Sequence, residues 1–301
     1  MGKIRTVNVL FDEDVRARLV AADAVRATRR AVLDAYRGLL AAPPRRRADV
    51  GDTSLVFTAG GYAGGPIGFR VYGLWPGTSD QAVLVWDGKG RLKGCVVGDE
   101  LGARRTGALG GVAVDTLARE DSTTAGIVGS GRQARSQLWA IASVRSLSRV
   151  RVFSPTREHR ERFARRAEAE LQVEAAACDT AERAVADADL VVLATRSERP
   201  VVQADWIRPG THLNTIGPKL ASSHETPSEL AERAAGLFSD SPEQALAYGE
   251  PFFTARSPVH LGAVIAGDQP GRTRADDVTV YCSTGLAGSE VVLAEALLDS
   301  A

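Results

Sequence analysis

The 301-residue chain has few of the residues that build disulfide frameworks or metal centres. Its three cysteines, Cys95, Cys178 and Cys282, are far apart, odd in number and form no CxxC motif. This pattern argues against a disulfide scaffold and favours a reducing, cytoplasmic environment. The four histidines show neither HExxH nor paired-ligand spacing, so we expect no structural or catalytic metal.

The chain also lacks an excess charge of either sign and any long apolar run. Lys and Arg together number 37, as do Asp and Glu, so the formal net charge at pH 7 is zero. Such a chain has no bulk attraction for nucleic acid or a membrane surface. It contains no run of about 18 apolar residues that would span a bilayer, and its acidic N-terminal segment does not resemble a signal peptide. We therefore expect a small-molecule substrate, with no nucleic-acid or membrane partner.

What the sequence does contain is a glycine-rich turn between an expected strand at 124–128 and a helix-forming segment, SQLWAIASV. In the GxGxxA pattern of this turn, the first glycine permits a tight turn and the second lets a pyrophosphate approach the backbone. The small third residue lets the helix pack on the strand, and the helix N-terminus offers free N–H groups to phosphates. We expect all six residues of the turn to bind a dinucleotide: Gly129, Ser130, Gly131, Arg132, Gln133 and Ala134.

Two different patterns of strands and helices divide the chain. The first part shows a helix at 12–40, ended by Pro43-Pro44, and then consecutive strands joined by short turns, which indicate an antiparallel sheet. From residue 124, strands alternate with helices, as in a doubly wound parallel sheet. We expect strands at 7–10, 55–59, 67–72, 81–86 and 92–97 in the first part, and at 124–128, 150–153, 173–176, 190–194, 212–216, 237–238 and 278–282 in the second.

The last helix, expected at 290–298, returns to the first part, so one domain is built from both chain ends. The predicted fold is α/β, a Rossmann-type doubly wound parallel sheet inserted into an α+β domain. We place the α+β domain at 1–118 plus 286–301 and the Rossmann dinucleotide-binding domain at 119–285. Further helices are expected at 98–119, 225–235 and 258–266.

These motifs resemble those of the ornithine cyclodeaminase/mu-crystallin family almost from end to end. The resemblance implies a homodimer, a substrate-binding and dimerisation role for the α+β domain, and nicotinamide-dependent chemistry at the Cα of an amino or imino acid. The segments that carry it are PPR at 43–45, GFRVY at 68–72, RTGA at 105–108, GIVGSGRQA at 126–134, VRVFSPT at 150–156, ADLVVLATRSERPV at 188–201, WIRPGTHLNTIG at 206–217, DSPEQAL at 240–246 and STGLA at 283–287.

The resemblance implies that Arg45, Arg70 and Arg105 hold the substrate carboxylate. Arg70 stands where most relatives have lysine. The planar guanidinium group suits bidentate carboxylate binding but cannot give up a proton near neutral pH, so we expect a clamp and not an acid. For Arg45 the alternative is a solvated basic loop, because two further arginines follow it.

Lys219 is the larger departure. Cyclodeaminases and alanine dehydrogenase carry an aspartate at this place, two residues beyond Gly217, and a cation cannot act as that carboxylate base. Lys219 is expected to be a general acid or to bind a substrate anion; the alternative is an exposed loop lysine. Relatives also carry an acidic residue where Leu55 stands. Both departures disfavour ornithine cyclodeamination.

These four positively charged side chains, the three arginines and Lys219, would lie in one cleft. They predict a substrate with two anionic groups, or with one carboxylate and another acceptor such as a keto oxygen. The leading interpretation is an NAD(P)H-dependent oxidoreductase, either an imine or ketimine reductase or an amino-acid dehydrogenase, with Arg70 and Lys219 as its catalytic residues. The alternatives are a cyclodeaminase-type lyase with bound NAD and a non-catalytic, mu-crystallin-like binding protein.

The segment after the expected strand at 150–153 favours NADP(H) over NAD(H). NAD enzymes usually place an acidic residue there to bind the ribose 2′-OH, whereas Ser154, Thr156 and Arg157 would accept a 2′-phosphate. The alternative is that Arg157 only begins the next helix and points to solvent. We treat His224 and Glu225 as the structural start of a helix. Further cofactor contacts are expected from Thr106, Ala194, Thr195, Ile216, Gly217, Ser283, Thr284 and Gly285.

Overall fold

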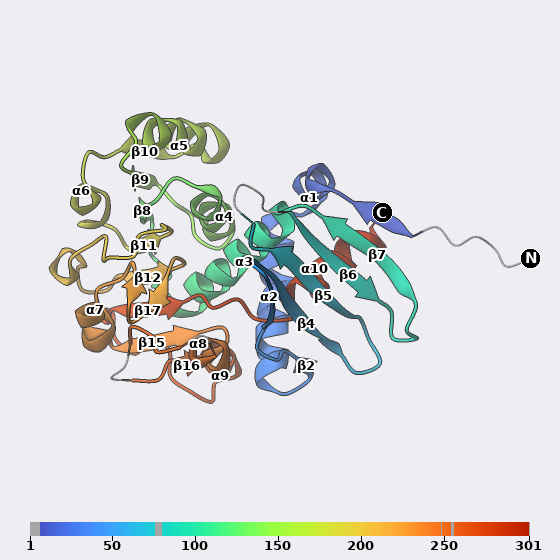
Figure 1. The fold of residues 1–301 in the computed structure, drawn as a ribbon. Helices are drawn as coiled ribbons and strands as arrows, with labels where there is room; N and C mark the ends of the chain where they lie inside the picture. Colours follow the sequence, from blue (N-terminus) through green and yellow to red (C-terminus); the bar gives the residue numbers. More distant parts are fainter. Residues whose placement is uncertain (1–6, 76–79, 248, 254–255, 301) are drawn as a thin grey trace, which may run out of the picture. The chain divides into compact units, whose positions relative to one another are not determined.

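The computed structural model describes residues 7–75, 80–247, 249–253 and 256–300. The chain divides into two compact units (Figure 1). Unit 1 comprises Met1–Arg105 and Leu286–Ala301, and unit 2 comprises Thr106–Gly285. The division falls inside helix α3 (Glu100–Leu117), whereas the sequence places it after that helix, at 118/119. The roles that we assigned to the two domains remain predictions.

Unit 1 is built on a sheet with the strand order β1-β7-β6-β5-β4-β2, to which β3 adds by pairing with β4. Neighbouring strands are antiparallel, as predicted, except that β1 pairs with β7 in parallel. Helix α10 (Ser289–Asp299) packs against helix α2 (Ala21–Tyr36) and against the strands β4 to β7, so the C-terminal segment returns to this unit as predicted. The strands are β1 (Asn8–Leu10), β2 (Leu40–Ala41), β3 (Arg46–Val50), β4 (Thr53–Tyr62), β5 (Ile67–Gly73), β6 (Gln81–Trp86) and β7 (Leu92–Val97).

The single helix expected at 12–40 is wrong. The structure has two helices, α1 (Asp12–Arg18) and α2 (Ala21–Tyr36), separated by Leu19 and Val20 in extended conformation. The break contains neither glycine nor proline. It places Leu19 in the core and lets its carbonyl oxygen accept a hydrogen bond from the Arg104 guanidinium at 2.9 Å. A partner distant in sequence therefore stabilises the break, and the local pattern carried no signal for it.

Unit 2 contains an eight-stranded parallel sheet, which confirms the predicted doubly wound architecture. Its strand order is β10-β9-β8-β11-β12-β17-β15-β16, so the direction of winding reverses between β8 and β11. In open α/β sheets, ligands bind beyond the carboxyl ends of the strands at such a reversal. The strands are β8 (Thr124–Val128), β9 (Arg149–Phe153), β10 (Glu174–Ala177), β11 (Leu190–Leu193), β12 (His212–Thr215), β15 (Gly236–Ser239), β16 (Val259–His260) and β17 (Thr279–Cys282).

The helices and minor strands of unit 2 correct two further expectations. The helix predicted at 225–235 begins only after Pro227, and the one predicted at 258–266 is preceded by strand β16. The helices are α4 (Arg132–Ile141), α5 (Arg157–Leu171), α6 (Ala181–Val185), the 3-10 turn η1 (Ala204–Trp206), α7 (Ser228–Arg233), α8 (Pro242–Leu246) and α9 (Leu261–Ala266), and the small hairpin consists of β13 (Lys219–Leu220) and β14 (Ser223–His224).

Apolar side chains cover both faces of the parallel sheet. On β11, Val191 and Leu193 belong to one buried cluster, and Leu190 and Val192 belong to another. Because successive side chains of a strand point to opposite faces, the two clusters lie on opposite sides of the sheet. A strand covered on both faces reads as a continuous apolar run, which explains why β11 was evident in the sequence.

Strand β12 is also fully buried but carries polar side chains that form a closed network. Asn214 donates through Nδ2 to Gln137 Oε1 at 3.0 Å, and Gln137 Nε2 donates to the carbonyl oxygen of Thr106 at 2.8 Å. The Asn214 Oδ1 atom therefore accepts from His212 Nε2 at 2.9 Å. The remaining ring nitrogen, Nδ1, lies 2.8 Å from the Thr279 hydroxyl, which consequently donates to it. The network requires a neutral histidine.

We predict a stability change with pH that comes from His212. Burial lowers the pKa of His212 to about 3 from an ordinary value of 6.5. Between these values the unfolded chain binds a proton that the folded chain does not, so the free energy of unfolding falls as pH falls, by up to about 1.4 kcal/mol per pH unit. Urea unfolding at pH 6 and pH 4 measures the slope. His212→Gln should reduce it, while exposed His159→Gln should not; equal slopes in all three proteins would contradict the prediction.

Candidate functional site

The glycine turn after β8 has the geometry that the sequence predicts for a diphosphate site. Gly129 has a φ of +110°, and a side chain there would collide with the Ala194 carbonyl oxygen. A Cβ atom on Gly131 would meet nothing within 4 Å, so the backbone is open to a ligand there. Gly131 is also the N-cap of α4 and provides no side-chain cap. Buried Ala134 lets the helix approach the sheet. These features fit a dinucleotide diphosphate.

The end of β9 carries hydroxyl groups and no carboxylate. The Ser130 hydroxyl donates to the Ser154 hydroxyl at 3.0 Å, and Ser154 in turn donates to the Thr156 carbonyl oxygen at 3.3 Å. Arg157 begins α5, is 76% exposed and pairs with Glu161 at 2.7 Å. Its present position therefore corresponds to the alternative of a solvent-facing helix residue. An exposed pair of this kind is weak and gives little resistance to rearrangement.

A buried carboxylate that we had treated as part of a helix holds the carboxyl ends of β11 and β12. Glu225 is completely buried and accepts five hydrogen bonds. Thr195 donates through its N–H and its hydroxyl, and Thr215 donates through its hydroxyl. The amides of Ile216 and Gly217 donate at 3.0 and 2.5 Å. One carboxylate therefore fixes Thr195, Ile216 and Gly217, which the sequence analysis expects to be cofactor contacts.

Lys219 follows this anchored segment, in the short strand β13. Its Nζ donates to the Gly217 carbonyl oxygen at 2.6 Å, and the side chain is half-buried. A side chain on Gly217 would collide with the Glu225 carboxylate, so this position requires glycine. The structure thus places Lys219 on a fixed turn beyond the carboxyl end of β12, not on a free exposed loop.

A second buried carboxylate, Asp240, fixes the other predicted cofactor segment. It accepts from the Thr284 amide at 2.8 Å and from the Gly285 amide at 2.7 Å. The Thr284 hydroxyl and the Tyr281 hydroxyl also donate to it. Ser283 is buried at the start of the same turn. This turn is therefore rigid at the carboxyl edge of β17.

Sequence reasoning missed the role of Glu225, although a signal was present. Pro227 disfavours helical conformation at the residue before it, so a helix starting at Glu225 was already improbable on local grounds. Asp240 lies in a segment that contributed to the family resemblance, but its contacts join residues about 45 positions apart along the chain. No local pattern reveals such a contact.

In unit 1, two of the three predicted carboxylate-binding arginines meet on one acidic side chain. The Arg70 Nη1 atom lies 3.0 Å from Glu290 Oε1, and Arg105 Nη2 contacts the same oxygen. Arg105 and Glu290 are 4% and 1% exposed, while Arg70 is 13% exposed. Arg45 precedes β3, is half-buried, and its charge also acts on Glu290. Sequence reasoning did not identify Glu290.

The side chains of this cluster remain ionised in the folded protein: Glu290 is negative, and Arg70 and Arg105 are positive. Burial alone would raise the pKa of Glu290, yet the guanidinium groups of Arg105 and Arg70 lower it below its ordinary value. Burial and the neighbouring Arg105 lower the pKa of Arg70, while Glu290 opposes them. An arginine remains protonated across the accessible pH range. Two positive charges therefore face one negative charge, so these three side chains together carry a net positive charge.

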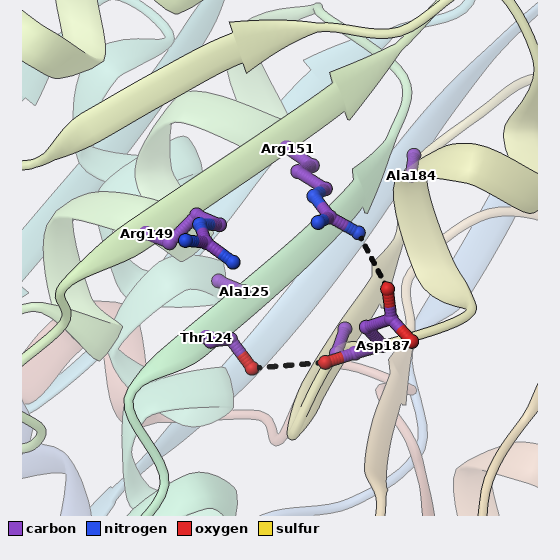
Figure 2. A pocket seen from close by; sticks show the side chains of 7 residues that line it. Thr124, Ala125, Arg149, Arg151, Ala184 and Asp187 are labelled. Carbon is purple, nitrogen blue, oxygen red and sulfur yellow. Dashed lines mark hydrogen bonds and ion pairs between the residues drawn. The ribbon is translucent and has the colours of Figure 1, made fainter.

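A small pocket in unit 2 lies at the amino ends of the strands and is separate from the glycine turn (Figure 2). It is lined by the beginnings of β8 and β9 and by α6. Arg151 pairs with Asp187 at 3.1 Å, and the Thr124 hydroxyl donates to the Asp187 carbonyl oxygen at 3.2 Å. Arg149, which also lines it, pairs with Glu174 at 2.9 Å. The pocket lies opposite to the edge where the dinucleotide is expected.

Among the described residues, no cluster of three or more His, Cys, Asp or Glu side chains has the arrangement of a metal site. Within the same residues, every helix is too short or too polar to cross a membrane.

Comparison with known proteins finds relatives in sequence and in fold. A ketimine reductase mu-crystallin from Mus musculus is 31% identical over 226 residues, which cover 74% of this chain and 70% of that protein. Delta(1)-pyrroline-2-carboxylate reductase from Thermococcus litoralis, solved with NADH and L-proline, superposes with a TM-score of 0.89 at 27% identity, over 97% of this chain and 96% of that one. The iminosuccinate reductase of Paracoccus denitrificans, solved with NAD+, also gives 0.89 at 27% identity, over 98% and 96%.

A family model matches residues 75–301, three quarters of the chain, which confirms the resemblance seen in the sequence motifs. The chain belongs to the ornithine cyclodeaminase/mu-crystallin family.

Proposed function

We propose that this protein is an NAD(P)H-dependent oxidoreductase that acts on the C=N bond of an imino acid or, in reverse, on the CH–NH bond of an amino acid. The observation that carries the proposal is the Arg70–Glu290–Arg105 cluster, which has one uncompensated positive charge. A substrate carboxylate supplies the missing negative charge. The similarity to two imine-reducing enzymes supports the same reaction class.

The residues of this chain would bind and orient the substrate and move one proton. Arg70, with Arg105 and Arg45, holds the carboxylate and so fixes the position of the adjacent imine carbon. When bound, a reduced nicotinamide supplies a hydride to that carbon. Lys219 Nζ, or an ordered water, gives the proton to the substrate nitrogen. A lysine cannot serve as the carboxylate base of a cyclodeaminase, which disfavours the lyase alternative.

The partner and location that we propose are those implied by the sequence: a homodimer in the cytoplasm. The most exposed large apolar side chains support a protein interface on unit 1, since all of them in the described residues except Leu220 and Leu246 belong to that unit. Burying such apolar side chains against a second protein is favourable. The free thiols of Cys95, Cys178 and Cys282 agree with a reducing compartment.

For the cofactor we predict a preference for NADPH, because no acidic side chain at the end of β9 would repel a 2′-phosphate. Ser154→Asp should shift the NADPH-to-NADH ratio of kcat/KM at least about tenfold toward NADH, which corresponds to about 1.4 kcal/mol. Ser154→Asn has the same shape without the charge and serves as the control. A KM for NADH equal to or below that for NADPH in the unaltered protein would contradict the prediction.

For the substrate we predict turnover of anionic imino acids in a cofactor-consumption screen. The panel should include mono- and dicarboxylic imino acids, cyclic imines, and keto acids with ammonia. Arg70→Lys should raise KM about tenfold or more, because lysine lacks the planar fork that binds a carboxylate at two points. A preference for uncharged or cationic side chains would overturn the anionic substrate, and ammonia release without net change in NAD(P)H would indicate the lyase instead.

A further inference from the structure

We infer that Glu290 is a positioning residue, which holds the guanidinium groups of Arg70 and Arg105 in the orientation that receives a substrate carboxylate. The inference rests on the proposed function, since it assumes a substrate with a carboxylate. It assigns a role on α10, at the far end of the chain from the predicted arginines, to a residue that the sequence analysis did not single out.

The first argument is that both arginines bind a single oxygen. Glu290 Oε1 accepts from Arg70 Nη1 at 3.0 Å and from Arg105 Nη2. Two guanidinium groups repel each other, and burial removes the solvent that would screen the repulsion. A shared carboxylate oxygen therefore brings the two groups close together and sets the angle between them. Without it, the two cations would separate or draw in another anion.

The second argument is that neutral contacts hold Arg70 on its other sides. Its Nε donates to Gln81 Oε1 at 2.8 Å, and its Cζ lies 4.5 Å from the centre of the Tyr72 ring. Helix α3 passes so close that a methyl group on Gly102 would stand 3.3 Å from that Cζ and 3.0 Å from the Gln81 oxygen. Among these contacts Glu290 alone is charged, so it makes the largest contribution to the orientation.

The third argument is that several buried polar atoms in this region have no partner among the described residues. They are Arg105 Nε and Nη1, Glu290 Oε2 and the hydroxyl of Thr58, which lies directly opposite Arg70 in the β4–β5 pair. Buried polar groups in folded proteins are almost always hydrogen-bonded. The cluster is thus incomplete by itself. An anion would accept from the two Arg105 nitrogens, in keeping with the net positive charge of the cluster, whereas Glu290 Oε2 requires a donor.

The test compares Glu290→Ala, Glu290→Gln and Glu290→Asp with the unaltered protein. A control on the same helix is Glu295→Gln, because Glu295 pairs with Lys93 at 3.1 Å in a half-exposed position. Removing Glu295 leaves no buried charge without a partner. All five proteins are assayed as full chains.

The first measurement needs no substrate. Thermal unfolding is recorded in sodium formate and in sodium chloride of equal concentration. Formate should fill the vacated carboxylate position in Glu290→Ala and raise its Tm over that in chloride by about 2 °C or more. In the unaltered protein and in Glu295→Gln, formate can occupy only the position of the substrate carboxylate, so the Tm difference should be clearly smaller than in Glu290→Ala. Equal Tm values in both salts for Glu290→Ala would overturn the inference, even if the proposed reaction is correct.

The second measurement uses the substrate found in the screen. Glu290→Gln should raise KM about tenfold or more, corresponding to about 1.4 kcal/mol, with a smaller effect on kcat. Glu290→Asp should recover part of the loss, and formate should do so in Glu290→Ala. The dissociation constant for NADPH, measured by fluorescence, should not change. A KM unaltered in Glu290→Gln would overturn the inference.

The two measurements keep the outcomes distinct. If the unaltered protein binds no nicotinamide nucleotide, the proposed function fails, while the formate effect still reports on the cluster. If Glu290→Ala does not fold, the near-isosteric Glu290→Gln, which removes the counter-charge but keeps the side-chain volume, tests the inference through its effect on KM. A purely structural role would lower Tm in every Glu290 variant and change neither the formate response nor KM.

Discussion

A carboxylate that is withdrawn from water must be met by hydrogen-bond donors or cations, and this requirement organises both units of the chain. Glu225 and Asp240 satisfy it with backbone amides and hydroxyl groups, and so fix the turns at the carboxyl edge of the parallel sheet. Asp189 satisfies it at the amino edge with Arg119, Arg208 and the Thr124 amide. Glu290 satisfies it with two arginines. In each case, hydrogen bonds or ion pairs offset the free-energy cost of burying the charge. The same contacts fix the conformation of a loop or a side chain.

The elements that the sequence predicts best are those determined by local patterns. Strands β6, β7 and β8 begin and end where predicted, because apolar alternation or a continuous apolar run is bounded by glycine turns or by the start of a helix. The break at Leu19 was not predicted, since its stabilising partner, Arg104, is 85 residues away. Local periodicity cannot contain that information.

The candidate site likewise combines residues that local motifs identify with a residue that only the folded chain brings to them. Arg70 and Arg105 were identified from motifs, and the structure brings them to one carboxylate. That carboxylate, Glu290, is 220 residues from Arg70 in the sequence. It lies on a helix with no distinct amphipathic pattern around it, so only the folded arrangement reveals it. Lys219 was identified as a departure from relatives, and its hydrogen bond to the Gly217 carbonyl oxygen became evident only with the turn.

The turn held by Asp240 also marks the place where the chain leaves unit 2, since Gly285 is the last residue of that unit. The amide of Gly285 is buried and bonded to a side chain that follows β15. Its hydrogen exchange with solvent therefore depends on local opening around Asp240, not on opening of a strand pair. The exchange rate of this one amide therefore reports how often the Asp240 turn opens while the parallel sheet stays intact.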